Sequence, residues 1–339
     1  MVEKRPSDTL MNGLPTLDVR TPKEFAQGHI PSALSFPLFT DLERHEVGTK
    51  YKQVGRDEAV LLGLEFVGPK LDNYVKEALK LAPEKKVNMY CWRGGMRSGS
   101  MAWLLRSAGF EVNLIEGGYK AWRTQVGELL SSPLKLINLG GLTGTGKTDV
   151  LKELSAQGEQ VLDLEELAKH TGSAFNAFEE EQPTTETFEN ELAASLLQMD
   201  MTQPIWVEDE SRNIGKVFLH NAFFASKDTA PFVLVNRSKE ERVKAICELY
   251  GDVPKEELIA SFKKIERRIG GQYLKAAIQN IKDGVLPSAA RIALRYYDKA
   301  YMHSMGKKDR KPVFSLSLTG KTATEAAKAL QAWRQKTNL

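Results

Sequence analysis

The chain has 339 residues, which is more than one ordinary domain needs, so we expect two domains. With 42% apolar and 27% charged residues, its composition is normal for a soluble globular protein. No run approaches the roughly 18–20 apolar residues of a membrane span, and the first residues carry no apolar signal core. Cys91 and Cys247 lie too far apart to suggest a disulfide framework. We therefore expect a cytoplasmic protein without membrane contact.

The net charge of +3 hides an uneven distribution of charge along the chain. Residues 237–339 hold 22 Lys and Arg against 11 Asp and Glu, so this segment is +11 and the rest of the chain is −8. Tyrosines are interleaved with the basic residues at positions 273, 296, 297 and 301. This pattern suits a nucleic-acid contact, but a set of solvated helix faces explains the charge equally well.

The first 130 residues alternate between strand patterns and helix patterns. Short apolar runs predict strands at 16–20, 33–36, 87–90 and 112–115, with helical patterns at 22–25, 59–82 and 100–106. Residues 40–58 are mostly polar, and residues 127–134 have the composition of a linker. The alternation predicts an α/β domain over residues 1–130, with a parallel sheet and its active loop at the carboxyl end of a strand.

Residues 90–100 contain the strongest chemical signal of this domain. Cys91 follows a predicted strand, and two glycines and two arginines lie within the next six residues. The glycines allow backbone N–H groups to point inward, while the arginines and a following helix N-terminus add positive charge. Such surroundings lower a cysteine pKa to roughly 3.5–7.5, which predicts a thiolate nucleophile in an anion-binding loop. The alternative is a core cysteine beside a glycine turn. The candidate residues of this loop are Cys91, Arg93, Gly94, Gly95 and Arg97.

A second motif begins at residue 141. The apolar run 135–139 leads directly into G-x-x-x-x-G-K-[ST] at residues 141–148, and a helical pattern follows at 149–157. In this setting backbone amides surround a phosphate chain, Lys147 reaches its terminal oxygens, and the Thr148 hydroxyl can bind Mg²⁺. The predicted phosphate-binding residues are Gly141, Thr143, Gly144, Thr145, Gly146, Lys147 and Thr148.

Further strands are predicted at 160–163, 204–207, 231–235 and 313–317, so residues 135–339 should form a doubly wound P-loop α/β domain. Glu208, Asp209 and Glu210 follow one strand at the place where such domains keep a metal-orienting acid. Arg237 and Arg242 follow the next strand, as lid arginines or as surface residues. The sequence gives no firm metal site; Mg²⁺ is a candidate ligand.

Three separated segments resemble the successive signatures of the rhodanese family: residues 18–33, the Cys91 loop and residues 116–122. The resemblance implies that Cys91 accepts a sulfur or selenium atom, that Asp18 and Arg20 support the loop, and that His29 is structural. The loop from Cys91 to Arg97 has seven residues, one more than in ordinary sulfurtransferases of that family. That length resembles the related phosphatases.

A rhodanese-like domain joined to a P-loop domain, with the segments 162–175 and 208–215, resembles the tRNA 2-selenouridine synthase family. The resemblance implies a transferase that acts on wobble 2-thiouridine in tRNA. Geranyl diphosphate would alkylate the sulfur, and selenium from selenophosphate would then replace it through a selenyl-cysteine at Cys91, with Arg93 and Arg97 holding the selenophosphate. We expect a monomer without a firmly bound cofactor. Phe175, Phe178 and Phe188 are candidates for a geranyl channel or for the core.

Two other functions remain open at this point. A phosphatase–kinase fusion acting on a small metabolite would also use a seven-residue cysteine loop and a P-loop. A nucleotide-gated RNA-binding protein would keep the cysteine domain as an inert module.

Overall fold

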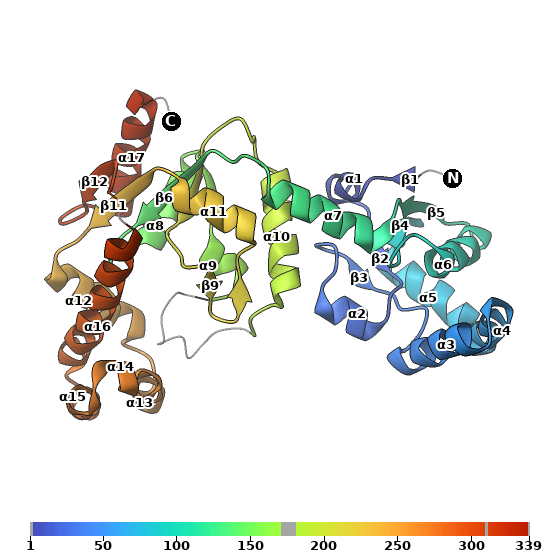
Figure 1. Ribbon diagram of the computed structural model, residues 1–339, viewed down its shortest axis with the longest axis horizontal. Helices are drawn as coiled ribbons and strands as arrows, with labels where there is room; N and C mark the ends of the chain where they lie inside the picture. Colours follow the sequence, from blue (N-terminus) through green and yellow to red (C-terminus); the bar gives the residue numbers. More distant parts are fainter. Residues whose placement is uncertain (1–2, 171–180, 309–310, 338–339) are drawn as a thin grey trace. The chain divides into compact units, whose positions relative to one another are not determined.

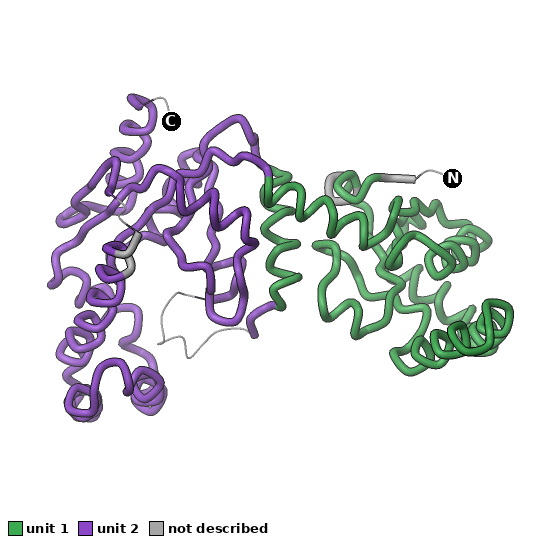
Figure 2. The backbone as a smooth tube through the Cα atoms, viewed as in Figure 1, with its two compact units in different colours: residues 1–131, 184–198 green, residues 132–183, 199–339 purple. Residues whose placement is uncertain are grey.

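The computed structural model describes residues 3–170, 181–308 and 311–337, and the chain divides into two compact units (Figure 2). Unit 1 comprises residues 1–131 and 184–198, and unit 2 comprises residues 132–183 and 199–339. The sequence-based division at 1–130 and 135–339 differs from this one in residues 184–198, which pack with the first unit. Among the described residues, no helix has the length and apolar character needed to cross a membrane.

Unit 1 is built on a five-stranded parallel sheet with the order β1-β5-β4-β2-β3. Its central strands are buried along nearly their whole length, which is why they read as continuous apolar runs. The core includes Leu17, Val87 and Met89 of the sheet and Met101 and Leu105 of a covering helix. The strands are β1 (Glu3–Lys4), β2 (Thr16–Asp18), β3 (Leu34–Ser35), β4 (Lys86–Tyr90) and β5 (Glu111–Ile115).

The helices of unit 1 connect these strands (Figure 1). They are α1 (Pro6–Met11), α2 (Pro22–Gln27), α3 (Asp41–Gln53), α4 (Arg56–Val67), the 3₁₀ turn η1 (Gly68–Lys70), α5 (Leu71–Leu81), α6 (Met96–Ser107) and α7 (Gly118–Leu130). A last helix, α10 (Thr185–Leu197), comes from the middle of the second half of the sequence and packs against α7.

Three sequence-based boundaries in unit 1 are wrong. The polar stretch 40–58 contains α3, which starts with a capping box in which Thr40 and Glu43 satisfy each other's backbone N–H groups. The predicted linker begins too early, because α7 continues through Leu130 and buries that side chain. Helix α6 begins at Met96 rather than at residue 100, so Arg97 lies in its first turn.

Unit 2 also contains a five-stranded parallel sheet, in the order β12-β11-β6-β8-β7. The central strand β6 runs directly into the P-loop, and its five residues are all buried. The strands are β6 (Leu136–Gly140), β7 (Gln160–Leu162), β8 (Ile205–Glu208), β11 (Phe232–Asn236) and β12 (Phe314–Ser317). Beside them lie α8 (Lys147–Ala156), α9 (Leu164–Leu167), α11 (Asn221–Thr229), α17 (Ala323–Thr337) and a hairpin of β9 (Asn213–Ile214) and β10 (Val217–Phe218). The α/β fold and all five predicted strands of this half are confirmed.

A group of helices between β11 and β12 has its own apolar core. Helix α12 packs against α16, and α15 packs against both α13 and α16, as the orange and red ribbons of Figure 1 show. Phe262, Leu274, Ala277 and Ala289 belong to this core. The members of this helical group are α12 (Lys239–Tyr250), α13 (Lys255–Lys264), α14 (Glu266–Ile269), α15 (Gly271–Lys282) and α16 (Leu286–Lys308). Much of the basic excess of the chain therefore lies on these helices.

Candidate active sites

Cys91 lies at the end of β4, where the chain leaves the sheet and curls toward α6. The residue is 3% exposed, whereas the loop residues 92–96 that follow it are exposed. Gly94 has φ +68°, a left-handed conformation that favours glycine. Gly95 is the N-cap residue of α6 and has a negative φ. The loop therefore turns mainly at Gly94 and places the cysteine sulfur at the start of a helix.

The sulfur of Cys91 accepts a hydrogen bond from the Ser98 hydroxyl over 3.2 Å. Burial raises the pKa of the Cys91 thiol, but hydrogen bonds from the Ser98 hydroxyl and N–H and from the Arg93 N–H lower it, as does the charge of Arg97. The net pKa lies below the ordinary value of a thiol. This arrangement stabilises a thiolate, which is the form that reacts as a nucleophile.

The two arginines of the loop have different surroundings. Arg97 forms a two-pronged ion pair with Glu24, with nitrogen–oxygen distances of 2.6 and 3.2 Å. Glu24 is itself held by the Thr21 N–H at 3.0 Å. Arg93 is exposed, and its side chain has no ion-pair partner in the part of the chain that the structure describes. Arg93 is therefore the loop arginine available to an anion, while Arg97 acts on the thiol from a fixed position.

The segment after β5 closes the other side of the loop. Tyr119 N–H donates to the Cys91 carbonyl, and Lys120 N–H donates to the Trp92 carbonyl, both over 2.9 Å. Gly118 has φ +60°, and a Cβ at this position would lie 2.3 Å from the Cys91 carbonyl oxygen. Only glycine allows this approach, which explains the glycine at position 118.

Asp18 and Arg20 form a buried ion pair beneath this loop. The Arg20 guanidinium is 2.6 Å from Asp18 Oδ2, donates to the Gly28 carbonyl over 2.7 Å, and lies over the Tyr119 ring with its carbon 3.7 Å from the ring centre. Both charged side chains are at most 1% exposed. They join three segments of unit 1, the β2 end, the Gly28 turn and α7. Their support of the cysteine loop stays a prediction.

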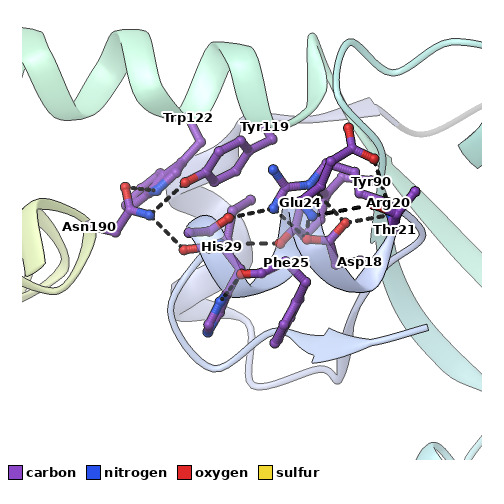
Figure 3. A network of polar contacts seen from close by, with 12 residues as sticks. Asp18, Arg20, Thr21, Glu24, Phe25, His29, Tyr90, Tyr119, Trp122 and Asn190 are labelled. Carbon is purple, nitrogen blue, oxygen red and sulfur yellow. Dashed lines mark hydrogen bonds and ion pairs between the residues drawn. The ribbon is translucent and has the colours of Figure 1, made fainter. Parts of the chain in front are cut away.

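The buried Asn190 of α10 extends this network (Figure 3). Its amide nitrogen donates to the His29 carbonyl and to the Tyr119 hydroxyl, both at 2.8 Å. Its carbonyl oxygen accepts from Trp122 Nε1 at 3.0 Å and from Arg123 at 2.7 Å. All of its hydrogen-bonding capacity is used, which fixes α10 to the helix that carries Tyr119. His29 contributes only its carbonyl here, and its ring stacks on Phe25 at 3.9 Å.

The P-loop in unit 2 follows the geometry expected of its motif. Gly144 and Gly146 have φ of +78° and +86°, and Gly146 precedes the first residue of α8, Lys147. The Lys147 ammonium donates to the Gly141 carbonyl over 3.0 Å. Thr145 is fully buried, and its hydroxyl donates to the Leu142 carbonyl over 2.8 Å, so its side chain holds the loop together. Gly141, Thr143, Gly144, Gly146, Lys147 and Thr148 line one open cleft of about 1530 Å³.

The two arginines after β11 have separate roles. The Arg237 guanidinium lies against Gly146, since a Cβ on that glycine would be 3.5 Å from an Arg237 nitrogen. This position is compatible with contact to a bound phosphate. Arg242 is 2% exposed and forms a two-pronged ion pair with Asp298 at 2.8 and 2.9 Å. The interpretation of Arg242 as a lid arginine is therefore wrong, because its charge is used inside the helical group.

Carboxylates gather at the edge of the same cleft. Glu208, the last residue of β8, is 1% exposed and accepts the Glu165 N–H over 3.0 Å. Burial and the neighbouring Glu210 raise the pKa of Glu165, and burial and Glu165 raise that of Glu208. Asp209 also lines the cleft, where its carboxylate accepts hydrogen bonds from the Asn138 amide and the Tyr301 hydroxyl, each over 3.3 Å, with the Lys227 ammonium at 3.9 Å.

The carboxylates near the P-loop can be compared with the ligands that Mg²⁺ requires. Among the described residues, no three His, Cys, Asp or Glu side chains are arranged to hold a metal ion. Mg²⁺ in phosphate sites needs only one or two carboxylates, because substrate phosphates and waters complete its shell. Thr148 and Glu210 line the cleft with Lys147, and raised pKa values show an excess of carboxylates there. Thr148, Glu210 and Glu165 are the residues that could hold Mg²⁺, which would neutralise charge on a phosphate chain.

Some of these residues could not be identified from the sequence. Glu24 and Asn190 lie 73 and 71 residues from their respective partners, Arg97 and Tyr119. Ser98 could have been noticed, because it stands at the start of the helix that follows the cysteine loop. Of the aromatic residues considered for a geranyl channel, Phe188 is fully buried in α10 of unit 1, and Phe175 and Phe178 lie outside the described residues.

The fold and both sites define a class of protein in which a rhodanese-like unit with a reactive cysteine is joined to a P-loop unit. Two family models match the chain: the rhodanese-like domain at residues 6–125 and the tRNA 2-selenouridine synthase AAA domain at residues 134–335. The chain belongs to the tRNA 2-selenouridine synthase family.

Relatives named tRNA 2-selenouridine synthase support this assignment along most of the chain. The protein from Shewanella woodyi is 34% identical over 91% of this chain and 92% of its own length. The protein from Sulfurovum sp. is 35% identical over 85% of this chain and 84% of its own length. The protein from Nitrosomonas europaea is 39% identical over 70% of this chain and 63% of its own length.

Proposed function

We propose that the protein converts 2-thiouridine in tRNA to 2-selenouridine, and that the two steps of this exchange use two different sites. The observation that carries the proposal is the pairing of these sites in one chain of this family. Unit 1 holds a buried cysteine whose pKa is lowered by hydrogen bonds, and unit 2 holds a P-loop with its lysine in an open cleft. A synthase that only moved selenium would have no need of the second site.

The first step that we propose is alkylation of the thiocarbonyl sulfur by geranyl diphosphate. A bond forms between this sulfur and the first carbon of the geranyl chain, while the bond from that carbon to the diphosphate oxygen breaks. The leaving diphosphate is a polyanion, and P-loop amides together with Lys147 are suited to stabilise it. Arg237, beside Gly146, lies where it can add a second positive charge. The step is useful because an alkylated sulfur leaves readily as a neutral thiol.

The second step takes place at Cys91. We propose that the Cys91 thiolate attacks the selenium of selenophosphate, so that an S–Se bond forms while the Se–P bond breaks and phosphite leaves. The selenium of this selenyl-cysteine then attacks C2 of the base, and the C2–S bond breaks as geranyl thiol leaves. A small-molecule thiol attacks the Cys91 sulfur, which breaks the S–Se bond and frees 2-selenouridine, and a second thiol reduces the resulting Cys91 disulfide. The exposed Arg93 and the loop amides are the anion-binding groups in this step. Arg97 contributes by lowering the thiol pKa from its ion pair with Glu24.

We assign tRNA binding to the basic helical group of unit 2. Arg268 donates to the Tyr296 hydroxyl over 3.2 Å, and Arg295 lies over the Tyr273 ring at 4.9 Å. These exposed pairs combine positive charge with aromatic faces, a combination suited to phosphates and unpaired bases. Arg268 also lines the P-loop cleft, so a bound tRNA could reach the phosphate site.

The test uses purified protein, tRNA carrying 2-thiouridine, geranyl diphosphate and Mg²⁺, followed by nucleoside mass spectrometry. S-Geranyl-2-thiouridine should appear without any nucleotide, and 2-selenouridine should replace it when selenophosphate is added. If 2-thiouridine persists under all these conditions, the proposal is wrong. Release of phosphate from an aryl phosphate, lost on Cys91→Ser, would instead support a phosphatase.

A further inference from the structure

A small apolar cavity lies inside the helical group of unit 2. Its volume is about 40 Å³, and its walls come from α12, α13, α15 and α16. Leu258, Phe262 and Ile281 supply bulky side chains on one side. Three alanines of α16 supply the other side, where larger residues would fill the space: Ala289, Ala290 and Ala293.

The cavity adjoins the P-loop cleft, because the two share part of their lining. Thr143 of the P-loop lines both of them, and so do Ile246, Tyr250 and Tyr297 of the helical group. Lys147 and Gly146 therefore line a cleft that has an apolar cavity next to it, with Thr143 of the P-loop in the wall of both. A ligand that fits both parts must carry phosphates at one end and an apolar group at the other.

The size and lining of the cavity narrow the choice of ligand. One water needs roughly 10–15 Å³ by this measure of volume, so the cavity takes about three or four carbon-sized atoms. That is close to the branched end of one isoprene unit. A nucleotide base is larger and carries several polar edge groups, whereas this lining is almost entirely apolar.

We propose that this cavity receives the terminal isoprene unit of the prenyl diphosphate whose diphosphate lies on the P-loop. The inference rests on the proposed function, and it adds where the chain lies and what limits its length. The inner part of the chain runs along the wall shared by cavity and cleft, at Ile246, Tyr250 and Tyr297. The cavity thus favours a ten-carbon chain over a fifteen-carbon chain, because its volume takes little more than one isoprene unit.

Filling the cavity tests this assignment. Ala293→Leu should raise the KM for geranyl diphosphate by roughly 10- to 100-fold, because the larger side chain displaces the buried end of the prenyl chain. The inhibition by inorganic diphosphate should stay unchanged, because that ion has no chain to enter the cavity. Ala327→Leu is the matched control, because Ala327 is fully buried in α17 and lines neither the cavity nor the cleft. An unchanged geranyl KM in a folded Ala293→Leu protein would overturn the assignment.

A second variant covers the case in which Ala293→Leu does not fold. Phe262→Leu enlarges the cavity, and the ratio of farnesyl to geranyl transfer should then rise several-fold; an unchanged ratio contradicts the assignment. The affinities of the wild-type protein for geranyl diphosphate and for inorganic diphosphate test the cavity without requiring any transfer reaction. This comparison therefore distinguishes a failure of the cavity assignment from a failure of the proposed function. Tighter binding of the geranyl compound without transfer would refute the function and support the cavity. Equal binding of both would refute the cavity.

Discussion

The Ser98 hydroxyl donates a hydrogen bond to the Cys91 sulfur over 3.2 Å, from the first turn of the helix that follows the loop. It is the largest of the interactions that lower the pKa of this thiol against the effect of burial. Ser98 is itself fully buried, so the bond is shielded from water. The reactivity of Cys91 thus depends on a residue outside the seven-residue loop.

Replacing Ser98 should therefore slow the chemistry of Cys91. Ser98→Ala removes a donor to the thiolate, so the thiol pKa rises and less thiolate is present at neutral pH. Loss of a hydrogen bond to a charged group corresponds to roughly a tenfold slower alkylation by iodoacetamide at pH 7. Ser100→Ala, at an exposed position of the same helix, is the control and should react like the wild type. Equal rates for all three proteins would show that Ser98 does not stabilise the thiolate.

Gly118 and Gly127 are both in α7 and form a matched pair for substitution by alanine. Gly118→Ala places a Cβ 2.3 Å from the Cys91 carbonyl oxygen at a positive φ, so the cysteine loop must shift. We expect a loss of more than about 1–3 kcal/mol in the free energy of unfolding, together with slower alkylation of Cys91. Gly127→Ala enters open space within the helix and should stabilise by up to about 1 kcal/mol. Chemical denaturation measures both; equal stabilities would mean that the two segments do not touch.

The raised pKa values of Glu165 and Glu208 predict a pH-dependent stability. An unfolded glutamate loses its proton near pH 4.5, but burial and mutual repulsion raise the pKa of this pair, so the folded protein holds a proton there to a higher pH. Above pH 4.5 the unfolded state therefore binds fewer protons, and this contribution to stability is complete below that pH and is lost as the pH rises through the raised pKa. Glu208→Gln keeps a neutral group at the buried position and should reduce the fall in Tm between pH 5 and pH 9. The exposed Glu240→Gln should leave that fall unchanged. A Tm profile of Glu208→Gln that parallels the wild type would contradict the raised pKa.

The affinity for tRNA should depend steeply on salt. If the helical group binds several phosphates, the logarithm of the binding constant falls with the logarithm of salt concentration by roughly 0.7–0.9 per contact. Charge reversal of the exposed Arg267 and Arg268 in α14 should make this slope less steep, by the amount that one or two phosphate contacts contribute. Fluorescence anisotropy with labelled tRNA gives the slope. The same slope in the double variant would place the tRNA surface elsewhere on the protein.

Local patterns predicted the strands and loops well, because each depends on residues that are close in sequence. Cys91 and Lys147 each follow an apolar strand, and ligands bind at the carboxyl ends of strands in parallel sheets. The structure places both residues just beyond such strand ends. The spacing of apolar residues does not predict helix α3, because no residue in this helix is buried. Its sequence signal is the capping box formed by Thr40 and Glu43 at its start.

Contacts between segments that are distant in the chain could not be predicted from the sequence. Nothing near Asn190 indicates that α10, which lies between two strands of the P-loop unit, completes the rhodanese-like unit through Tyr119 and Trp122. The prediction for Arg242 depended on its position after a strand, which suggested a lid arginine. In the structure its guanidinium forms an ion pair with Asp298, which lies 56 residues away in the sequence. Charged side chains change their role when a partner comes from another element, and a single sequence does not show such pairs.

The most direct test of the two-site account is nucleoside mass spectrometry of tRNA treated with two single variants. Cys91→Ser should still produce S-geranyl-2-thiouridine and should accumulate it, because only the second step uses the thiol. Lys147→Ala should slow geranylation by about 10²–10³, since it loses the charge that stabilises the leaving diphosphate, yet it should selenate tRNA that was geranylated beforehand. If Cys91→Ser leaves only 2-thiouridine, or if Lys147→Ala fails on geranylated tRNA, the two steps do not belong to separate sites.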